Sequence, residues 1–158
     1  MMVGRRGLPG KYSRLAGLAL LLYFWFSGVA LALDYRSVGA ESAILYDSPS
    51  LHGKRLFVVD KYYPVEIIVN LDQWAKVRDI TGSLAWIEKK NLSSVHMVLV
   101  TAALADVRQS ADLKAPLVFQ AERDVALELV EYGAAGWLKV RHRDGQVGFV
   151  QASQVWGS

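Results

Sequence analysis

A segment of nineteen residues occurs twice in this chain, and this repeat constrains the fold more than any other feature. Residues 74–92 align without a gap with residues 137–155. Trp, Lys, Val, Arg and Gly coincide, and the apolar positions agree almost throughout. A repeat of this kind indicates that one small structural unit is used twice. We therefore expect two copies of a single β module. The repeat does not identify a ligand.

The pattern within each copy predicts strands. Residues 65–69 are rich in branched side chains and suit a half-buried strand of period two. A Thr-Gly-Ser turn at residues 81–83 lies between two further strand-like segments, which predicts a hairpin. Residues 89–92 and 152–155 are each expected to form one helical turn. Met97 to Arg108 is expected to carry the opening strand of the second unit.

One segment gives conflicting signals. Glu, Ala and Leu dominate residues 122–132, which favours a helix. The same segment aligns with the alternating residues 65–69 of the first unit, and this register predicts a strand. We expect the first unit at residues 42–95 and the second at residues 97–158, with 34–41 as a short polar lead-in.

The first 32 residues have the pattern of a signal peptide, expected to be helical. A positive head is followed by an apolar run over 15–28 and by Ala30-Leu31-Ala32, the small-residue spacing that a signal peptidase reads. We expect cleavage after Ala32. The alternative is an uncleaved anchor, because residues 15–33 carry no charge and approach the roughly 20 residues of a spanning helix. Either interpretation predicts an exported chain, periplasmic or secreted, or anchored facing the periplasm, with membrane contact only through this segment.

Composition narrows the function classes once this leader is set apart. The chain has 18 basic and 15 acidic residues, and four of the basic residues but no acidic one lie in the leader, so the remainder has 14 against 15, a net charge of −1. Nucleic-acid binding is therefore not expected, since it needs a basic surface. The chain has no cysteine, which excludes disulfides, an acyl-cysteine anchor and a thiol nucleophile.

Two motifs of the second unit resemble the bacterial SH3-like (SH3b) domain family. They are Gly-Trp-x-Lys-Val-Arg at 136–141 and Gly-x-x-Gly-Phe-Val at 145–150. The first unit departs more, with Gln73 and Ala85 in place of two of these glycines. The resemblance implies an all-β chain with two tandem five-stranded SH3-like barrels. It also implies an exported binding module for cell-wall or protein ligands.

Aromatic side chains are the best candidates for a binding surface. Trp74 and Trp137 are expected to share a strand face with basic residues, where a Trp stacks on a peptide or sugar and a cation holds a carboxylate. The competing interpretation is ordinary packing against a neighbouring strand. Trp86 and Phe149 are expected in the core. The candidate ligand-binding residues are Tyr46, Tyr63, Trp74, Tyr132, Trp137 and Arg141.

No residue pattern indicates catalysis, a metal site or a cofactor. His52, His96 and His142 are scattered and lack ligand spacing such as HExxH. Residues 45–47 also resemble part of the Ala-Leu-Tyr-Asp-Tyr stretch of eukaryotic SH3 domains, but the paired Trp of those proline-binding domains is missing. We predict a non-catalytic binding module for a cell-wall peptide or another exported protein. The alternatives are a structural protein that docks onto an envelope complex, or a small wall-active hydrolase accessory.

Overall fold

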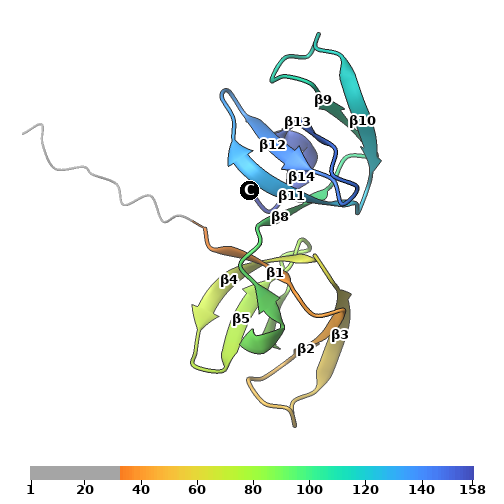
Figure 1. Cartoon of the computed structure of the whole chain (residues 1–158). Coiled ribbons are helices and arrows are strands. Elements are labelled where there is room, and N and C mark those ends of the chain that lie inside the picture. The colour runs from red at the N-terminus through yellow and green to blue at the C-terminus, as the bar shows by residue number, and fades with distance from the viewer. Residues whose placement is uncertain (1–32) are drawn as a thin grey trace, which may run out of the picture. The chain divides into compact units, whose positions relative to one another are not determined.

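The structure, a computed structural model, describes residues 33–158 and contains two seven-stranded antiparallel sheets (Figure 1). The expected signal peptide and its cleavage site lie outside the described residues. The first sheet, which we call the first barrel, has the order β3-β2-β6-β5-β4-β1-β7. Its strands are β1 (Tyr35–Val38), β2 (Ser42–Tyr46), β3 (Arg55–Asp60), β4 (Pro64–Asn70), β5 (Trp74–Arg78), β6 (Leu84–Glu88) and β7 (Leu92–Ser93), with the 3-10 turn η1 (Lys89–Asn91) before β7.

The second sheet, the second barrel, repeats the same order as β10-β9-β13-β12-β11-β8-β14. Its elements are β8 (Met97–Val100), β9 (Leu104–Arg108), β10 (Leu117–Glu122), β11 (Ala126–Tyr132), β12 (Trp137–Arg141), β13 (Val147–Gln151), η2 (Ala152–Gln154) and β14 (Val155–Trp156). The prediction of two similar all-β units in tandem is confirmed. Each sheet has seven strands rather than the expected five, because β1 and the two-residue β7, and likewise β8 and β14, add to it.

The strands form where side chains alternate between the barrel interior and its outer surface. Along β5, Ala75 and Val77 are buried, while Trp74, Lys76 and Arg78 lie on the outer side and are at least partly exposed. The segment with helical composition is indeed a strand, β11, which pairs with both β12 and β8. Register and packing therefore outweigh local propensity there. Both predicted helical turns are present as η1 and η2.

Strand β1 was missed from the sequence, where its residues were expected to be a polar lead-in. It has only four residues, two of which are Arg36 and Ser37, so its own pattern is weak. It is a strand because it pairs with β4 on one side and β7 on the other. Met97 to Arg108 was expected to carry one opening strand. The structure instead divides this segment into two strands, β8 and β9.

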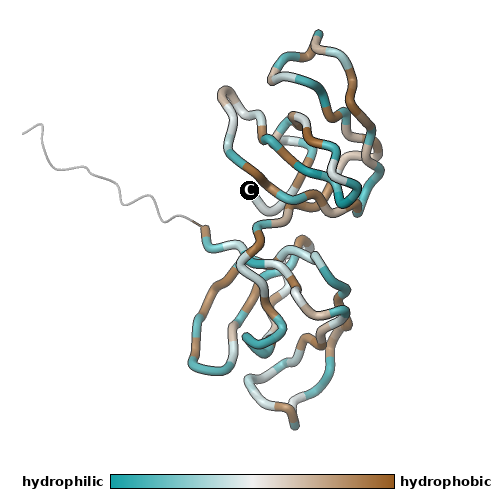
Figure 2. The backbone as a smooth tube through the Cα atoms, in the orientation of Figure 1, coloured by the Kyte–Doolittle hydropathy of each residue, from teal (hydrophilic) through white to brown (hydrophobic). Residues whose placement is uncertain are grey.

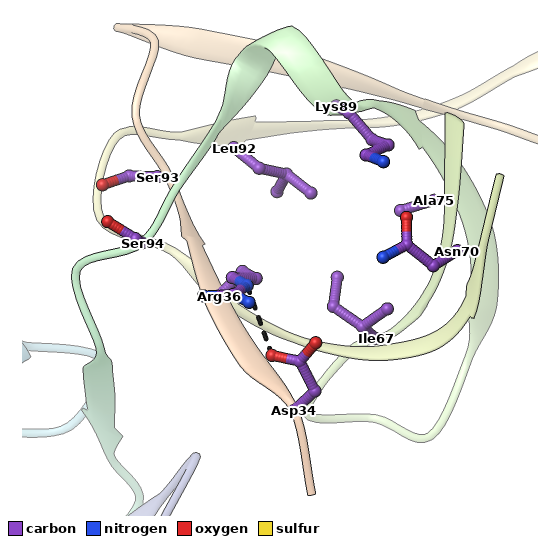
Figure 3. Close-up of a pocket in the computed structure, with 9 residues that line it drawn as sticks. All are labelled: Asp34, Arg36, Ile67, Asn70, Ala75, Lys89, Leu92, Ser93 and Ser94. Carbon is purple, nitrogen blue, oxygen red and sulfur yellow. Dashed lines mark ion pairs between the residues drawn. The ribbon is translucent and has the colours of Figure 1, made fainter. Parts of the chain in front are cut away.

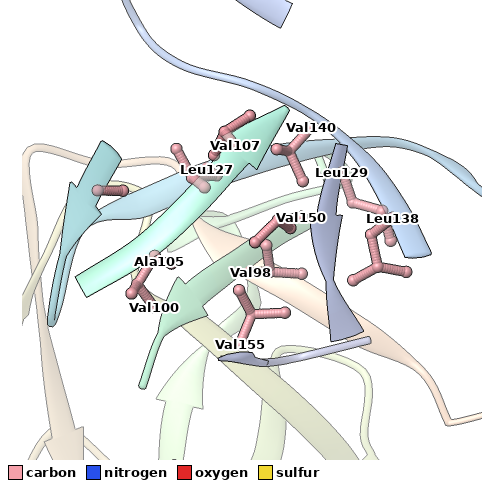
Figure 4. Packing of buried hydrophobic residues seen from close by; sticks show 11 residues of the cluster. Val98, Val100, Ala105, Val107, Leu127, Leu129, Leu138, Val140, Val150 and Val155 are labelled. Atoms are coloured by element: carbon pink, nitrogen blue, oxygen red, sulfur yellow. The ribbon is translucent and has the colours of Figure 1, made fainter. Parts of the chain in front are cut away.

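Each barrel has its own apolar core. Val65, Val77 and Ile87 are fully buried in the first barrel, and Leu127 and Val140 are fully buried in the second (Figure 4). Figure 2 shows apolar and polar residues alternating along much of both barrels. No helix within residues 33–158 is long and apolar enough to cross a membrane.

Candidate functional site

Two of the predicted site residues lie in contact on the outer surface of the first barrel. The rings of Tyr46 and Trp74 meet edge to face, with centroids 5.5 Å apart. Tyr46 is 5% exposed and Trp74 is half-buried, so the pair presents mainly the indole to solvent. The contact is the edge-to-face geometry that aromatic rings prefer. The pair therefore stabilises the barrel wall and leaves only part of one ring for a ligand.

Tyr63 lies apart from this pair. Its side chain packs against the core of the first barrel. Burial raises the pKa of its phenol, with a further contribution from the nearby carboxylate of Asp79. The structure therefore does not join Tyr63 to Tyr46 and Trp74 in one groove.

The predicted residues of the second barrel are also in different environments. Trp137 is buried at 8% exposure, whereas Tyr132 is 65% exposed and meets the ring of His96 with centroids 6.3 Å apart. Arg141 forms an ion pair with Glu128, its Nη1 lying 3.0 Å from Oε2. Trp137 thus has little surface left for a ligand, and the guanidinium of Arg141 already has a carboxylate partner.

The expectation that Trp86 and Phe149 belong to the core was wrong. Both are half-buried on the outer surface, and a lysine ammonium lies over each ring, Lys76 at 5.9 Å and Lys139 at 6.0 Å from the centroids. Their neighbours Ala85 and Val150 are among the residues that point into the barrels. Because side chains alternate along a strand, the inward positions belong to those neighbours.

A pocket of about 210 Å³ opens at one end of the first barrel, and we call it the barrel-1 pocket (Figure 3). It lies where β1, η1 and β7 meet β4 and β5. Its lining residues are Asp34, Arg36, Ile67, Asn70, Ala75, Lys89, Leu92, Ser93 and Ser94. This volume lies below the roughly 300 Å³ at which whole small-molecule sites begin. The pocket therefore suits one end or one side chain of a larger ligand.

The lining has an apolar part and a cationic part. Ile67, Ala75 and Leu92 supply the apolar part, and Ile67 and Leu92 pack at the edge of the core rather than within it. The Nε of Arg36 lies 3.2 Å from Oδ1 of Asp34. The ammonium of Lys89 donates a hydrogen bond to the carbonyl of Leu71 at 3.0 Å. With two cations and one carboxylate, the lining carries a net positive charge of one.

The second barrel closes the same position with apolar side chains. Arg36 pairs with Val65 as Val98 pairs with Leu127, so Arg36 and Val98 are equivalent. Ala75 pairs with Ile87 as Leu138 pairs with Val150, so Leu138 takes the place of Ala75. Val98 and Leu138 are both buried, at 0% and 3% exposure, within the core of the second barrel (Figure 4).

Two other positions of the pocket lining are likewise polar in the first barrel and apolar in the second. Lys89 opens η1, and Ala152, the residue that opens η2, takes its place. Ser93 pairs with Ser37 in the first barrel, and Trp156 pairs with Leu99 in the second. The two barrels therefore share one backbone register but differ at this end, polar and open in the first and apolar and filled in the second.

Arg36, Ala75 and Lys89 were not among the site residues predicted from the sequence. A signal was present in the repeat itself, because Tyr-Arg-Ser-Val at 35–38 takes the place of Met-Val-Leu-Val at 97–100. A charge at a position where the other copy is apolar marks a departure from the shared core. That comparison required the repeat to be extended to residues 35–38, where its sequence similarity is weakest.

No group of three or more His, Cys, Asp or Glu side chains that could hold a metal ion occurs among residues 33–158. Asp144 lies at the turn between β12 and β13. Its pKa is lowered to about 2, chiefly by the backbone amide of Gln146, then by the side-chain amide of Gln146 and by His142. These contacts stabilise a turn, which Gly145 makes possible with a φ of 94°.

Comparison with solved structures gives distant likenesses. NlpC2 and NlpC1 from Trichomonas vaginalis are 14% and 16% identical to the chain, each with a TM-score of 0.37. The matches cover 80% and 84% of this chain and 49% and 48% of those chains, so the chain spans about half of their length. Likenesses this distant carry no conclusion about the chain. Comparison with curated proteins yields no match.

The family comparison is decisive for the fold. The bacterial SH3 domain family matches twice in tandem, over residues 39–94 and 101–157. These two matches fall on the two barrels and cover most of the chain. Domains of this family are typically cell-wall binding modules. The chain therefore belongs to the bacterial SH3 domain family and carries two copies of the domain.

Proposed function

We propose that the chain is an exported, non-catalytic binding module whose first barrel holds a ligand of the cell envelope, either a cell-wall peptide or a segment of another exported protein. The family match supports a binding role, and the N-terminal sequence pattern supports export. In this proposal the chain is periplasmic or secreted, or anchored with both barrels facing the periplasm. The second barrel has a structural role at the corresponding end.

The observation that carries the proposal is the open barrel-1 pocket beside its filled counterpart. A small barrel gains stability by filling its interior, since a cavity in a core costs free energy. The second barrel shows that Val98 and Leu138 can fill this end within the same register. The first barrel instead has Arg36 and Ala75 there, with Lys89 at the rim. A ligand accounts for an opening that the fold itself does not require.

Retention on purified cell-wall sacculi tests the proposal. We expect the protein to be retained at low ionic strength and the Ala75→Leu variant to be retained much less, because leucine fills the pocket as Leu138 does. Unfolding curves of both proteins in urea show whether the variant is still folded. Absence of retention of the unmodified protein at low ionic strength would remove the cell-wall form of the proposal. Capture of an exported protein that Ala75→Leu abolishes would support the other form.

The non-catalytic part of the proposal has a separate test. We expect no release of soluble fragments when sacculi are incubated with the protein, with or without added divalent metal ions. Fragments that accumulate in proportion to protein concentration and time would instead support the wall-active hydrolase accessory.

A second candidate function, docking onto an envelope complex, is favoured by one observation on the first barrel. Strand β3 is an edge of its sheet and exposes Phe57 at 53% and Val58 at 68%. An exposed apolar edge strand can accept a strand from another protein. A Val58→Lys change should abolish capture of a partner in that case and leave retention on sacculi unchanged. Equal capture by both proteins would argue against docking through β3.

A further inference from the structure

The barrel-1 pocket places its charges and its apolar surface side by side. In Figure 3, Arg36 and Asp34 lie on one side of the space and Lys89 on the other, with Ile67 and Leu92 between them. A ligand group that enters must therefore offer a polar and an apolar part at close spacing. This requirement excludes a purely apolar group and an isolated small anion as complete ligands.

The cationic side chains retain donors for a ligand. The ion pair of Arg36 with Asp34 uses Nε, so the two terminal nitrogens of the guanidinium lie outside that ion pair. Lys89 has three ammonium donors, and the hydrogen bond to Leu71 takes one of them. An arginine fork and a lysine ammonium are well suited to a carboxylate, because charge-assisted hydrogen bonds are stronger than neutral ones. The net positive charge of the lining favours an anionic group over a cationic one.

The second barrel shows that these cations are not needed for folding. Val98 and Ala152 stand at the positions of Arg36 and Lys89, and the second barrel forms the same sheet with them. Partial burial of a charge costs desolvation energy unless a partner compensates it. Asp34 compensates one of the two charges, and the other is available to a ligand.

The size of the pocket and the closeness of its two parts select among carboxylates. At the last residue of a peptide, the carboxylate and the side chain branch from the same carbon atom. In an internal Asp or Glu, the carboxylate lies at the far end of the side chain and brings no second branch. A cavity of about 210 Å³ holds a small terminal residue but little more.

We infer that the barrel-1 pocket binds the C-terminus of a peptide that ends in a small apolar residue. The terminal carboxylate lies between Arg36 and Lys89, and the small side chain contacts Ile67, Leu92 and Ala75. Asn70 and the serines at 93 and 94 are placed to bond the preceding peptide group. This inference rests on the proposed binding function of the first barrel and adds the chemical class of its ligand.

Short peptides test the inference directly. N-acetyl-Ala-Ala is added to the protein as the free acid and as the amide, and binding is followed by NMR chemical shifts of the backbone amides. We expect the acid to shift the amides of Ala75 and Ser93, and the amide form to bind about tenfold more weakly or worse, because it lacks the charge. N-acetyl-Ala-Asp-amide, with an internal carboxylate, should also bind more weakly than the free acid. Equal binding of the three probes would overturn the inference.

Two adjacent lysines provide a matched pair of variants. Lys89→Gln should weaken binding of the free acid about tenfold, whereas Lys90→Gln should leave it unchanged, since Lys90 is exposed and paired with Glu88. The Ala75→Leu variant should lose binding of the acid and the amide alike. Equal weakening by the two glutamine variants would indicate general attraction and would overturn the inference.

The two enantiomeric forms of the probe separate the sources of such a terminus. Tighter binding of the D,D-dipeptide acid would assign the site to a cell-wall peptide, and tighter binding of the L,L form to the C-terminus of a protein. If no dipeptide binds but sacculi still retain the protein in a way that Ala75→Leu abolishes, the C-terminus inference fails and the proposed function stands. If neither sacculi nor any exported protein is bound, the proposed function itself fails.

Discussion

The two barrels have the same strand order and register but finish one end of the barrel in opposite ways. In the first, Arg36, Ala75 and Lys89 leave a polar opening, and in the second, Val98, Leu138 and Ala152 stand at those positions, with Val98 and Leu138 buried. The same strand register accepts either set of side chains, as the equivalent pairing of the two barrels shows. A duplicated fold can thus keep its scaffold while only one of its two copies keeps a pocket at this position.

The outer surfaces differ as well. Tyr46 is the neighbour of Trp86 across the sheet, and Arg108 has the same place beside Phe149. Tyr46 packs on Trp74, whereas Arg108 reaches the carbonyl of Ala115 at 2.8 Å and the carboxylate of Asp106. The first barrel thus uses an aromatic contact where the second uses a polar network. Both arrangements cover the same stretch of barrel wall.

Opening the second barrel should give the largest effect. Leu138→Ala removes a buried side chain and creates in the second barrel the opening that the first one has. We expect the free energy of unfolding, measured in urea, to fall by about 2–5 kcal/mol. Leu104→Ala is the control, because Leu104 lies in the same barrel and is 48% exposed; its effect should stay within about 0.5 kcal/mol. A loss below about 1 kcal/mol for Leu138→Ala would mean that an opening carries little cost in this fold.

The equivalent ion pairs of the two barrels should contribute different amounts to the free energy of unfolding. Arg78 and Arg141 each lie 3.0 Å from a carboxylate oxygen, but the Glu66 side chain is 9% exposed and that of Glu128 is 36% exposed. Arg78→Ala leaves a buried charge without its partner, and we expect a loss of about 2–3 kcal/mol at neutral pH, reduced from the fully buried case because Arg78 itself is exposed. Arg141→Ala should cost less than about 1 kcal/mol.

A second change checks the cause of that difference. Adding Glu66→Gln to Arg78→Ala removes the unpaired charge and should restore part of the lost stability. Equal losses for the two arginine variants would show that the burial of Glu66 does not control the difference.

The aromatic pair of the first barrel should contribute a smaller energy. A double-mutant cycle with Tyr46→Leu and Trp74→Leu should give a coupling of about 0.5–1.5 kcal/mol in the free energy of unfolding. The same cycle on Arg108 and Trp137 is the control in the second barrel and should give a smaller coupling. Additive effects of the Tyr46 and Trp74 substitutions would contradict a specific ring contact.

The smallest effect concerns the turn after β12. The pKa of Asp144 is lowered from 3.8 to about 2 because its charged form accepts hydrogen bonds, so the turn is fully supported above pH 3.8 and loses this support as the pH falls through about 2. Carbon-13 NMR of the carboxyl group should show this titration. Gln146→Ala, which removes the side-chain amide and keeps the backbone one, should raise the pKa part of the way toward 3.8. A midpoint near 3.8 in the unmodified protein would contradict these bonds.

Much of the fold was predictable because the repeat supplies two independent copies of each pattern. The alignment of residues 125–129 with 65–69 correctly predicted a strand against helical composition, although its register was two residues off, since Leu127 takes the place of Val65. The prediction failed for Trp86 and Phe149, whose equivalent positions were expected to face inward although the alternation along β6 and β13 faces them outward. It also missed β1, because four residues with a charge among them carry too weak a pattern.

The candidate site was the least predictable part. The aromatic residues singled out from the sequence are distributed over separate surroundings, with Tyr46 and Trp74 together, Tyr63 against the core and Trp137 buried. Aromatic side chains serve packing and binding equally well, so their presence alone does not distinguish the two. The pocket depends on an alanine, Ala75, and small residues give no signal of the space that they leave.

That two similar β units follow one another, and which family they resemble, could be predicted from the amino-acid pattern, since the glycines, the tryptophans and the alternation of the hairpins are local features. Which of the two units has a pocket became visible only in the folded barrels. A pocket arises from side chains far apart in the chain, here β1, β4, β5, η1 and β7, and from the volume that they leave unfilled. That volume depends on the packing of all of them together, which no local pattern contains.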